Sequence, residues 1–419
     1  MAAARDPRRD FLLSLFQAGL AAVNGRACMR AALAGREDLG DVWVLAVGKA
    51  AASMTLGVLD ALGPRVRRAL VVSREECLDP GLADHPCVVT RRGGHPVPDA
   101  ASLEAGEAAL QMAREVAAGQ PVLLLVSGGA SSLLEVLPRG VSLEDLRRFT
   151  EWALASGLDI GQVNAVRRRL SRVKDGRLLA ALSRGRVEGY FISDVPGDDP
   201  TVVGSGLLAR AETVDSLPSG LPGWVLAMAR QSVPAAEGLT IPRHCVARLE
   251  DALAAIAAAA GTILPVTCPA GRLDGDAVRV AQDVCAMLAA PGEGLWVLGG
   301  ETTVMLPRHP GRGGRNQHLA LAAALEIAGR DDLLLLAAGS DGSDGNTLDA
   351  GALVDGGTLQ RGQDGGFDAR RCLAAADSGR FLEASGDLLH TGATGTNVGD
   401  LVLALHCEPG HSPGGTPSM

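Results

Sequence analysis

The sequence predicts an α/β protein of two domains, each built on a sheet with helices on both faces. Short apolar runs, most of them ending in glycine, alternate with alanine-rich helical stretches along the 419 residues. Such alternation is typical of parallel sheets that are covered on both faces. The length suggests two or three domains, and the proline- and glycine-rich stretch Pro218–Pro242 marks the expected boundary. The expected parts are residues 1–235, residues 236–407 and a disordered tail, 408–419.

Each expected element follows from a local pattern. Six short apolar runs predict strands at Val42–Val47, Ala69–Ser73, Val122–Val126, Gly189–Ile192, Leu295–Leu298 and Leu333–Ala338. Helices are expected at Phe11–Val23, Ala101–Ala118, Leu253–Ala260, Asp276–Ala290 and His318–Gly329. In such folds ligands bind beyond the carboxyl ends of the strands, and most of the glycine-rich clusters fall there.

Composition narrows the class of protein. Apolar residues make up 47% of the chain and aromatic residues only 3%, so the cores must be built from alanine, leucine and valine. A net charge of -9 argues against a nucleic-acid-binding protein. No run approaches the ~20 apolar residues of a membrane span. Eight cysteines without CxxC spacing indicate a reducing, cytoplasmic location.

A lysine and a serine- and glycine-rich loop follow two of the expected strands. Lys49 comes after Gly48 and begins a helix, where it either reaches a phosphate as a point charge or points to solvent. The loop Ser127–Ser132 is expected to open a helix whose free N–H groups favour a phosphate or carboxylate. The alternative for this loop is an ordinary strand-to-helix turn with serine caps.

Two arginines lie among three glycines in Gly311–Gln317, before an expected helix. Arg315 is closest to the helix start, where its cation opposes the helix dipole, so an anion clamp is the favoured interpretation. Acidic loops follow two strands and contain Asp341, Asp344 and Asp349, and Asp194, Asp198 and Asp199. Clustered oxygens suit Mg²⁺, although turn and cap roles would account for most of the six.

Other charged residues have simpler interpretations. A helical stretch is expected from Asn164 to Leu182, with most of its positive charges on a solvated face. These charges include Arg168, Arg169, Arg172 and Lys174. His95 is interpreted as a turn-fixing residue rather than a base. The sequence has no GxxxxGK[ST] motif, no kinase HRD or DFG set and no clean GxGxxG fingerprint after its early strands.

In their order along the chain, these clusters resemble the type II glycerate kinases, the family with a C-terminal MOFRL domain. The matching segments are Val47–Ala50, Gly94–Asp99, Val126–Leu133, Asn164–Arg167, Ser193–Val195, Gly299–Thr303, the clusters that begin at Gly311 and Gly339, and Thr391–Asp400. They extend from about Phe11 to His406. Most are weak alone, but the ordered set is highly specific.

The resemblance implies two three-layer α/β/α domains, the N-terminal one Rossmann-like with a parallel sheet and the C-terminal MOFRL domain with a mixed sheet. It also implies ATP-dependent phosphorylation of D-glycerate at the 2-hydroxyl group, with ATP and Mg²⁺, in a cleft between the domains. The protein is expected to be a cytoplasmic monomer or homodimer that binds neither nucleic acid nor membrane.

The resemblance marks Lys49 and Arg315 as the suspected catalytic cations. In the mechanism that we expect, Asp194, or as second choice Asp341, accepts the hydroxyl proton or binds Mg²⁺, and both are candidate Mg²⁺ ligands. The phosphates of ATP are expected at Ser127, Gly128, Gly129, Ala130, Ser131 and Ser132. Residues expected to bind the substrate, or to support those that do, are Asn164, Arg167, Glu301, Arg312, Asn316, Thr394 and Asn397.

Two alternatives and two departures stay open. Some members of the family carry the name hydroxypyruvate reductase, which makes an NAD(P)H-dependent reductase the second candidate, and a sugar-acid-binding regulatory protein is the third. The family usually has Lys-Gly-Gly where this chain has Lys174-Asp175-Gly176, and Ser-Gly-Pro where it has Ser205-Gly206-Leu207. A carboxylate at Asp175 would repel an anionic substrate unless it points away.

Overall fold

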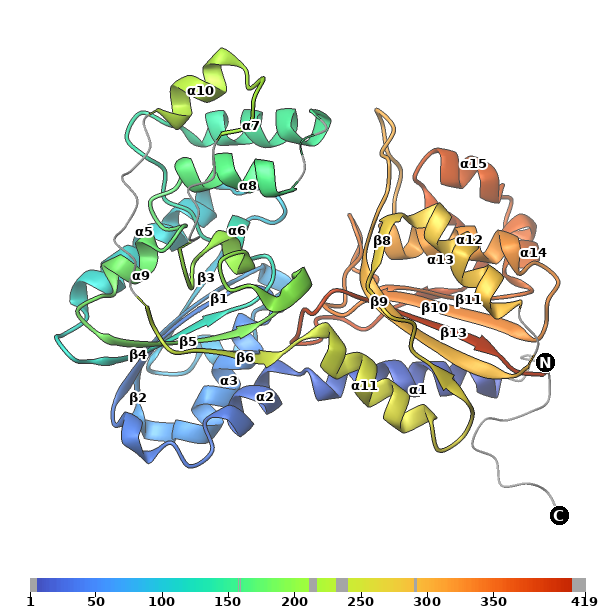
Figure 1. Cartoon of the computed structure of the whole chain (residues 1–419), viewed down its shortest axis with the longest axis horizontal. Coiled ribbons are helices and arrows are strands. Elements are labelled where there is room, and N and C mark those ends of the chain that lie inside the picture. The colour runs from blue at the N-terminus through green and yellow to red at the C-terminus, as the bar shows by residue number, and fades with distance from the viewer. Residues whose placement is uncertain are drawn as a thin grey trace. The chain divides into compact units, whose positions relative to one another are not determined.

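The structure, a computed structural model, describes residues 6–156, 158, 160–210, 217–230, 240–289 and 292–408. By their contacts they form two compact units, each built on one sheet (Figure 1). The N-terminal unit holds residues 24–248 and 395–397, and the C-terminal unit holds residues 6–23, 249–394 and 398–408. The predicted boundary at 235/236 and the predicted disordered residues 409–419 lie outside the described chain, so both stay predictions.

The N-terminal unit has a six-stranded sheet in the order β3-β2-β1-β4-β5-β6, and all its strands are parallel. The strands are β1 (Val42–Val47), β2 (Val66–Ser73), β3 (Val88–Arg92), β4 (Pro121–Val126), β5 (Arg186–Ile192) and β6 (Arg243–Ala247). The strand order reverses between β1 and β4. A crevice beyond the carboxyl ends of the strands at such a reversal is the usual ligand position in this class of fold.

Helices cover both faces of this sheet. They are α2 (Gly25–Ala32), α3 (Ala51–Leu62), α4 (Pro80–Ala83), α5 (Ala100–Glu115), α6 (Ala130–Leu133), α7 (Leu143–Ala155), α8 (Ile160–Arg169), α9 (Arg177–Ala181) and α10 (Gly223–Ala229). In Figure 1, α2 and α3 lie on one face of the sheet and α5, α6 and α9 on the other. Helices α7, α8 and α10 share a separate small core around Phe149 and Val166.

The C-terminal unit has a mixed seven-stranded sheet, in the order β12-β11-β10-β13-β9-β7 with β8 beside β9. Its strands are β7 (Val266–Thr267), β8 (Leu273–Asp276), β9 (Gly294–Thr303), β10 (Leu333–Gly339), β11 (Gly351–Asp355), β12 (Leu388–Leu389) and β13 (Asp400–His406). Strands β7 and β8 run parallel to β9, and the other pairs are antiparallel.

Helices also cover both faces of the mixed sheet. Helices α1 (Pro7–Ala22) and α11 (Leu249–Ala260) lie on one face, and α12 (Ala277–Leu288) and α13 (Arg315–Glu326) on the other (Figure 1). The remaining helices are α14 (Thr358–Asp364), α15 (Ala369–Ala374) and α16 (Ser378–Ser385). The predicted fold class, two α/β units with one parallel and one mixed sheet, is confirmed.

Several local predictions were wrong. The helix expected from Asn164 to Leu182 is two helices, because the Ser171 hydroxyl accepts the N–H groups of Val173 and Lys174 and the following Asp175 has a left-handed φ of 55°. The serine- and glycine-rich loop does open a helix, α6, which begins within the loop at Ala130 and has only four residues. Seven strands have no counterpart among the predicted ones: β3, β6, β7, β8, β11, β12 and β13.

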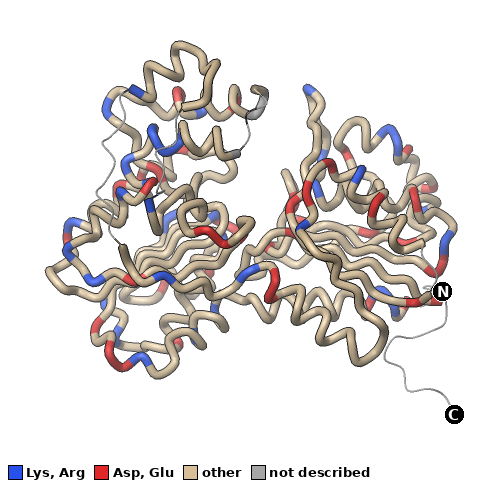
Figure 2. Tube along the Cα trace, viewed as in Figure 1, with Lys and Arg blue, Asp and Glu red and all other residues tan. Residues whose placement is uncertain are grey.

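Charged residues are rare along both sheets. Figure 2 shows strands drawn almost entirely in tan, with charges gathered at strand ends, in loops and on helices. Apolar side chains of β4 and β10, such as Leu124 and Leu335, are fully buried. The polar residues that could carry chemistry therefore lie at the ends of the strands rather than within the sheets.

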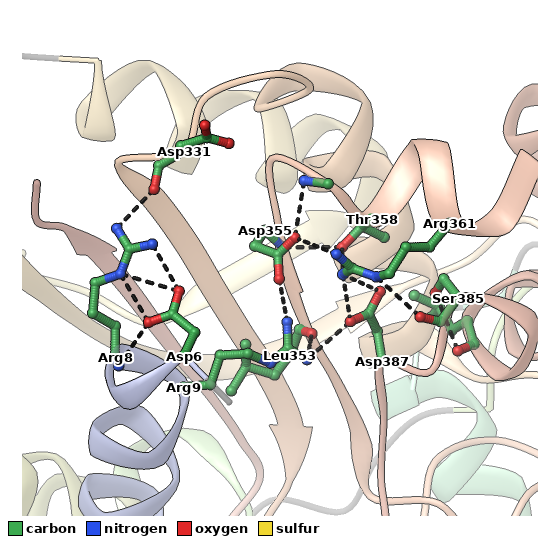
Figure 3. Close-up of polar contacts among 12 residues, drawn as sticks. Asp6, Arg8, Arg9, Asp331, Leu353, Asp355, Thr358, Arg361, Ser385 and Asp387 are labelled. Atoms are coloured by element: carbon green, nitrogen blue, oxygen red, sulfur yellow. Dashed lines mark hydrogen bonds and ion pairs between the residues drawn. The ribbon is translucent and has the colours of Figure 1, made fainter. Parts of the chain in front are cut away.

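Helix α1 is attached to the C-terminal unit by ion pairs. Arg9 pairs with Asp355 and with Asp387, whose side chain is 2% exposed, and Arg361 pairs with both carboxylates (Figure 3). Arg8 donates to the backbone oxygens of Asp331 and Cys407. A cavity of about 1180 Å³ lies beside the helix and is lined by these residues other than Cys407.

One helical stretch near the N-terminus, Pro7–Ala32, is long and apolar enough to cross a membrane by length and composition alone. A buried helix of a globular core passes the same test. Within this stretch α1 ends at Ala22, α2 begins at Gly25, and α1 buries Leu12 and Phe16. The burial of Leu12 and Phe16 accounts for the apolar face of α1, and the ion pairs of Arg9 attach the helix to the C-terminal unit.

Candidate active site

Two loops at the carboxyl ends of β1 and β4 are hydrogen-bonded to each other in the N-terminal unit. The N–H of Lys49 donates to the oxygen of Gly128 over 2.9 Å, and the N–H of Ala50 donates to the Ser127 hydroxyl over 3.0 Å. Gly48 has a φ of 132°, and a Cβ atom there would lie 2.2 Å from the Ser127 oxygen. A glycine is therefore required at position 48. The close approach of the two loops fixes the position of the Lys49 backbone.

Gly128 brings two further candidate residues to the same loop. A Cβ atom at Gly128 would lie 1.9 Å from Asn397 Nδ2 and 2.0 Å from Asp194 Oδ2. Asn397 Nδ2 also donates to Asp194 Oδ2 over 3.2 Å. Asp194 follows β5, the strand next to β4, so the carboxylate reaches the loop from the neighbouring strand end. The structure thus brings Lys49, Gly128, Asp194 and Asn397 together.

His95 also contacts this loop. Gly129 has a left-handed φ of 82°, and a Cβ atom there would lie 3.1 Å from His95 Cδ2 and 3.2 Å from Lys49 Cγ. The preceding Gly94 donates its N–H to the side chains of Asp99 and Ser102. These bonds show how the turn is held, and the contact with Gly129 places the imidazole beside the candidate site.

A short chain of hydroxyl and amide groups connects the loop to α8. The hydroxyls of Ser131 and Ser205 lie 2.7 Å apart, and the Ser205 hydroxyl donates to Asn164 Oδ1 over 3.4 Å. Ser205 is buried and has a left-handed φ of 57°, which is a strained conformation for a residue with a side chain. Asn164, predicted as a substrate or supporting residue, is therefore linked to Ser131 of the predicted phosphate loop.

The sequence predicted Lys174 on a solvated helix face, and the structure shows that this prediction was wrong. Its side chain is 1% exposed and forms an ion pair with Glu135, which is buried to the same degree. Burial lowers the pKa of Lys174, and Glu135 opposes that effect. The helix break after Ser171 turns this part of the chain inward, which explains why helical periodicity misplaced it.

Arg167 lies close enough to Glu135 for an electrostatic attraction. Burial lowers the pKa of the Arg167 guanidinium, and the carboxylate of Glu135 partly offsets this. The carboxylate of Asp175 lies 3.9 Å from the guanidinium of Arg177. Asp175, which stands where the family usually has glycine, therefore adds a carboxylate that is paired with Arg177.

In the C-terminal unit Arg315 begins α13 and is held by carboxylates. Its Nε lies 2.5 Å from Asp400 Oδ2, its Nη2 donates to Asp400 Oδ1 over 3.1 Å, and Nη1 pairs with Glu301. Burial alone would lower the pKa of Arg315, but Asp400 and Glu301 outweigh burial and raise it. From the sequence alone, Arg315 had no evident structural role. In the structure, Asp400 and Glu301 fix the direction of its guanidinium group.

Asp344 caps the same helix from inside the unit. Its carboxylate accepts the N–H groups of Asn316, over 3.1 Å, and Gln317, over 2.8 Å. Burial and the nearby Asp400 raise the pKa of Asp344 to about 7, although the two N–H groups oppose the change. The Asn316 amide also donates to Asp344, and its Oδ1 is buried without a hydrogen-bond partner among the described residues.

The other candidates of the C-terminal unit are dispersed. Asp341 Oδ1 accepts from the N–H and hydroxyl of Ser343, and the Thr394 hydroxyl donates to the oxygen of Ser340. Arg312 pairs instead with Asp349 and Glu383. The structure thus brings Arg315, Glu301 and Asn316 near one another through their carboxylate partners, and it gives Arg312 a separate ion-pair network.

No group of three or more His, Cys, Asp or Glu residues with the geometry of a metal site occurs in the described parts of the chain. Mg²⁺ in phosphoryl-transfer sites needs only one or two protein carboxylates because phosphate oxygens and waters complete its shell. The Asp194 carboxylate beside the backbone of Gly128 fits that donor set.

Sequence reasoning missed several residues of these clusters. Asp400 is the last residue of the segment 391–400 that the sequence did single out, and Glu135 lies two residues beyond the segment 126–133; in both cases the signal was a carboxylate at or near the end of a motif. His95 was noticed but interpreted as a turn residue. The role of Lys174 depends on a helix break for which the sequence offered only Ser171 and Gly176.

Two family models match the chain. The first, a domain of unknown function (DUF4147), matches residues 11–217, and the second, the MOFRL family, matches residues 294–400. The chain is 33% identical over 387 residues to the D-glycerate 2-kinase of Thermotoga maritima, covering 88% of this chain and 91% of that one.

A second relative and a solved structure extend the comparison. A putative hydroxypyruvate reductase of Agrobacterium vitis is 34% identical, over 95% of this chain and 94% of that one. The crystal structure of a glycerate kinase from Thermotoga maritima matches with a TM-score of 0.79 at 29% identity, covering 95% of this chain and 99% of that chain. The similarity therefore spans both units.

Proposed function

We propose that this chain, which belongs to the family of glycerate kinases with a C-terminal MOFRL domain, phosphorylates D-glycerate with ATP at the 2-hydroxyl group. The observation that carries the proposal is the cluster of Lys49, Gly128, Asp194 and Asn397 at the carboxyl ends of β1, β4 and β5. It joins a cation, a glycine-rich backbone and a carboxylate, which are groups that phosphoryl transfer uses. The relatives named as glycerate 2-kinases support the choice of substrate.

In the N-terminal unit the proposed roles follow from position. The backbone of the loop 127–132 binds phosphate oxygens of ATP, and the lack of a side chain at Gly128 makes room for Asn397 and Asp194 beside that loop. The Lys49 ammonium neutralises negative charge on the transferring phosphoryl group. The Asp194 carboxylate accepts the proton of the glycerate hydroxyl while that oxygen bonds to the γ-phosphorus and the bond to the leaving ADP oxygen breaks.

Asn397 and Arg315 have supporting roles in this proposal. The Asn397 amide holds one oxygen of Asp194, which orients the carboxylate. Arg315, fixed by Asp400 and Glu301, supplies a second cation for the anionic reactants. Asp194 and Asp341 remain the proposed Mg²⁺ ligands, and a bound Mg²⁺ would neutralise phosphate charge.

A hydroxypyruvate reductase is the second candidate, because relatives in Agrobacterium vitis carry that name. A dinucleotide enzyme of this architecture normally has a GxGxxG turn after its first strand. Here β1 is followed by Gly48-Lys49-Ala50-Ala51. The kinase assignment is therefore preferred. The cytoplasmic location, the choice between monomer and homodimer, and the absence of nucleic-acid and membrane partners stay predictions from the sequence.

The proposal is tested by measuring ADP release with D-glycerate, with and without EDTA, and NADH oxidation with hydroxypyruvate. We expect ADP release that requires both D-glycerate and a divalent cation, and no NADH oxidation. ADP release that is unaffected by EDTA would contradict the Mg²⁺ part. NADH oxidation without ADP release would establish the reductase instead.

A further inference from the structure

The chain uses lysine at only two positions, and one of them is buried. Of its 39 Lys and Arg residues, two are lysines, Lys49 and Lys174. Neither lysine is fully exposed, and all the other cationic side chains of these two types are arginines, so composition alone would favour arginine at these two positions as well. A lysine carries a compact point charge, whereas the guanidinium is a wide planar fork. The two lysines thus place a compact cation where the rest of the chain uses guanidinium groups.

Lys174 and Glu135 form a buried ion pair. Both side chains are 1% exposed, and Glu135 Oε1 also accepts the N–H of Val136 over 2.9 Å. The Lys174 N–H is held by the Ser171 hydroxyl over 3.1 Å. A buried ion pair seldom stabilises a fold more than apolar side chains of the same size would. Its presence therefore calls for a reason other than stability.

With Arg167 included, the buried pair becomes part of a cluster with a net positive charge. The N–H of Arg172 donates to the oxygen of Val136 over 2.7 Å, so the chain that follows α8 lies beside the residue after Glu135. The Arg167 guanidinium is within electrostatic range of Glu135 and Lys174, and the three groups together have one excess positive charge. The neighbouring Arg177 pairs with Asp175 and leaves the balance unchanged. An excess charge in a largely buried position is costly unless an anion offsets it.

The position of the cluster relates it to the candidate site. Arg167 is one turn after Asn164 on α8, so the two residues share a face of the helix. Asn164 is linked through Ser205 to Ser131 of the loop that is proposed to bind phosphate. Glu135 follows the same loop by a few residues. The cluster and the loop therefore belong to one continuous set of polar groups in the N-terminal unit.

We propose that Arg167, Lys174 and Glu135 form the site that selects the carboxylate of the acceptor. In this site Arg167 binds the carboxylate and Lys174 is a positioning residue: by pairing with Glu135 it prevents Glu135 from neutralising Arg167. The inference rests on the proposed function, because it names the part of the acceptor that this cluster binds. It predicts that the sign of the cluster's charge, rather than the presence of the ion pair, controls the affinity for D-glycerate.

Two single variants separate charge from packing. Lys174→Met removes the buried cation, so Glu135 pairs with Arg167, and KM for D-glycerate should rise roughly tenfold or more. Glu135→Gln leaves the cluster at least as positive as before, so KM for D-glycerate should stay the same or fall. KM for ATP should change less than twofold in both. A purely structural pair would give the same direction of change in both variants, which would overturn the proposal.

The double variant and a surface control complete the kinetic test. Glu135→Gln with Lys174→Met restores one net positive charge and should recover most of the lost affinity. A double variant as weak as Lys174→Met would contradict the proposal. Arg172→Met removes an exposed cation two residues from Lys174 and should leave KM for D-glycerate unchanged. An equal effect of Arg172→Met would show that only the overall charge matters.

A binding measurement without ATP keeps this inference separate from the kinase assignment. Incorporation of ¹³C-labelled lysine yields two lysine side-chain signals in the folded protein, and the Lys174→Met variant assigns them. We expect D-glycerate alone to shift the Lys174 signal in the wild type, and Arg167→Met to abolish the shift. Glycerate binding without ADP release would refute the kinase and keep the cluster. ADP release with D-glycerate but without any Lys174 shift would refute the cluster.

Discussion

At the scale of single residues, the candidate site depends on a few positions, such as Gly48 and Gly128, where a larger side chain would collide with its neighbours. Lys49 directly follows Gly48, which lies against Ser127, and its N–H donates to Gly128. These contacts fix the position of the Lys49 backbone. The sequence predicted Lys49, Gly128 and Asp194 as site residues, because each follows a strand. It could not predict that Gly128 contacts Asn397, since the two are separated by most of the chain.

The first prediction concerns Lys49. Lys49→Met should lower kcat by roughly 10³-fold or more, because a cation on a transferring phosphoryl group can contribute that much. The melting temperature should change little, since the Lys49 side chain is only half buried. Steady-state kinetics and thermal unfolding check both parts. A near-normal kcat would show that Lys49 is a solvated residue at a helix start.

The second prediction concerns Gly128. Gly128→Ala places a methyl group where Asn397 and Asp194 lie, at 1.9 and 2.0 Å, so both side chains must move. We expect a loss of activity of at least tenfold through the displaced Asp194. The matched control is Gly223→Ala at the start of α10, where no atom lies within 4 Å of the added group. Equal activities of the two variants would mean that Asp194 need not remain at the loop.

At the scale of elements, the strands were easier to predict than the helices that form the site. The apolar runs of β1 and β10 agree with the structure nearly to the residue, because buried strands leave a continuous apolar signal. Helices α8 and α9 were predicted as one, because the break depends on the Ser171 hydroxyl and the left-handed Asp175. Local hydrogen bonds of this kind leave almost no pattern in a sequence.

The third prediction concerns the cap of α13. The pKa of Asp344 is about 7 in the folded protein, above the usual 3.8 of an aspartate in the unfolded chain. Between these values the folded state keeps a proton that the unfolded state has lost, so stability should fall as pH rises from about 4 to 7. Asp344→Asn should remove this part of the pH dependence, which amounts to at most roughly 4 kcal/mol.

Urea unfolding of the wild type and Asp344→Asn at pH 4.5, 6.0 and 7.5 measures this slope. The control is Asp368→Asn, because Asp368 also caps a helix but is exposed to solvent. The control should follow the pH dependence of the wild type. Parallel slopes for the wild type and Asp344→Asn would contradict the assignment of a raised pKa to Asp344.

At the scale of the whole molecule, the sequence predicted two α/β units but not how the chain is divided between them. Helix α1 belongs to the C-terminal unit, more than two hundred residues away along the chain, and residues 395–397 belong to the N-terminal unit. Neither assignment has a local signal, because each depends on contacts between distant segments, such as those of Arg9 with Asp355 and Asp387.

The fourth prediction concerns this attachment of α1. Arg9→Ala removes one partner of two partly buried carboxylates and should destabilise the protein by about 1–3 kcal/mol. Burial would raise the pKa of Asp355, but Arg361 and Arg9 outweigh it and lower that pKa. The stabilisation by Arg9 should therefore be present at neutral pH and be lost as acid protonates Asp355. Urea unfolding at pH 7 and in acid checks it.

The matched control for Arg9 is Arg67→Ala. Arg67 pairs with Asp41, and both side chains are more than half exposed, so about 0–1 kcal/mol is expected. If Arg9→Ala cost no more than this control, the ion pairs in Figure 3 would not hold α1 in place.

Phosphorus NMR of a reaction with ATP, Mg²⁺ and D-glycerate tests directly whether this chain transfers phosphate to the 2-hydroxyl group. We expect the γ-phosphate signal of ATP to disappear and a phosphomonoester signal to appear, split into a doublet by the single proton on carbon 2 of glycerate. A triplet would place the phosphate on the 3-hydroxyl group, whose carbon carries two protons. An unchanged ATP spectrum, with the folded protein saturated in D-glycerate, would contradict the assignment of this chain as a glycerate kinase.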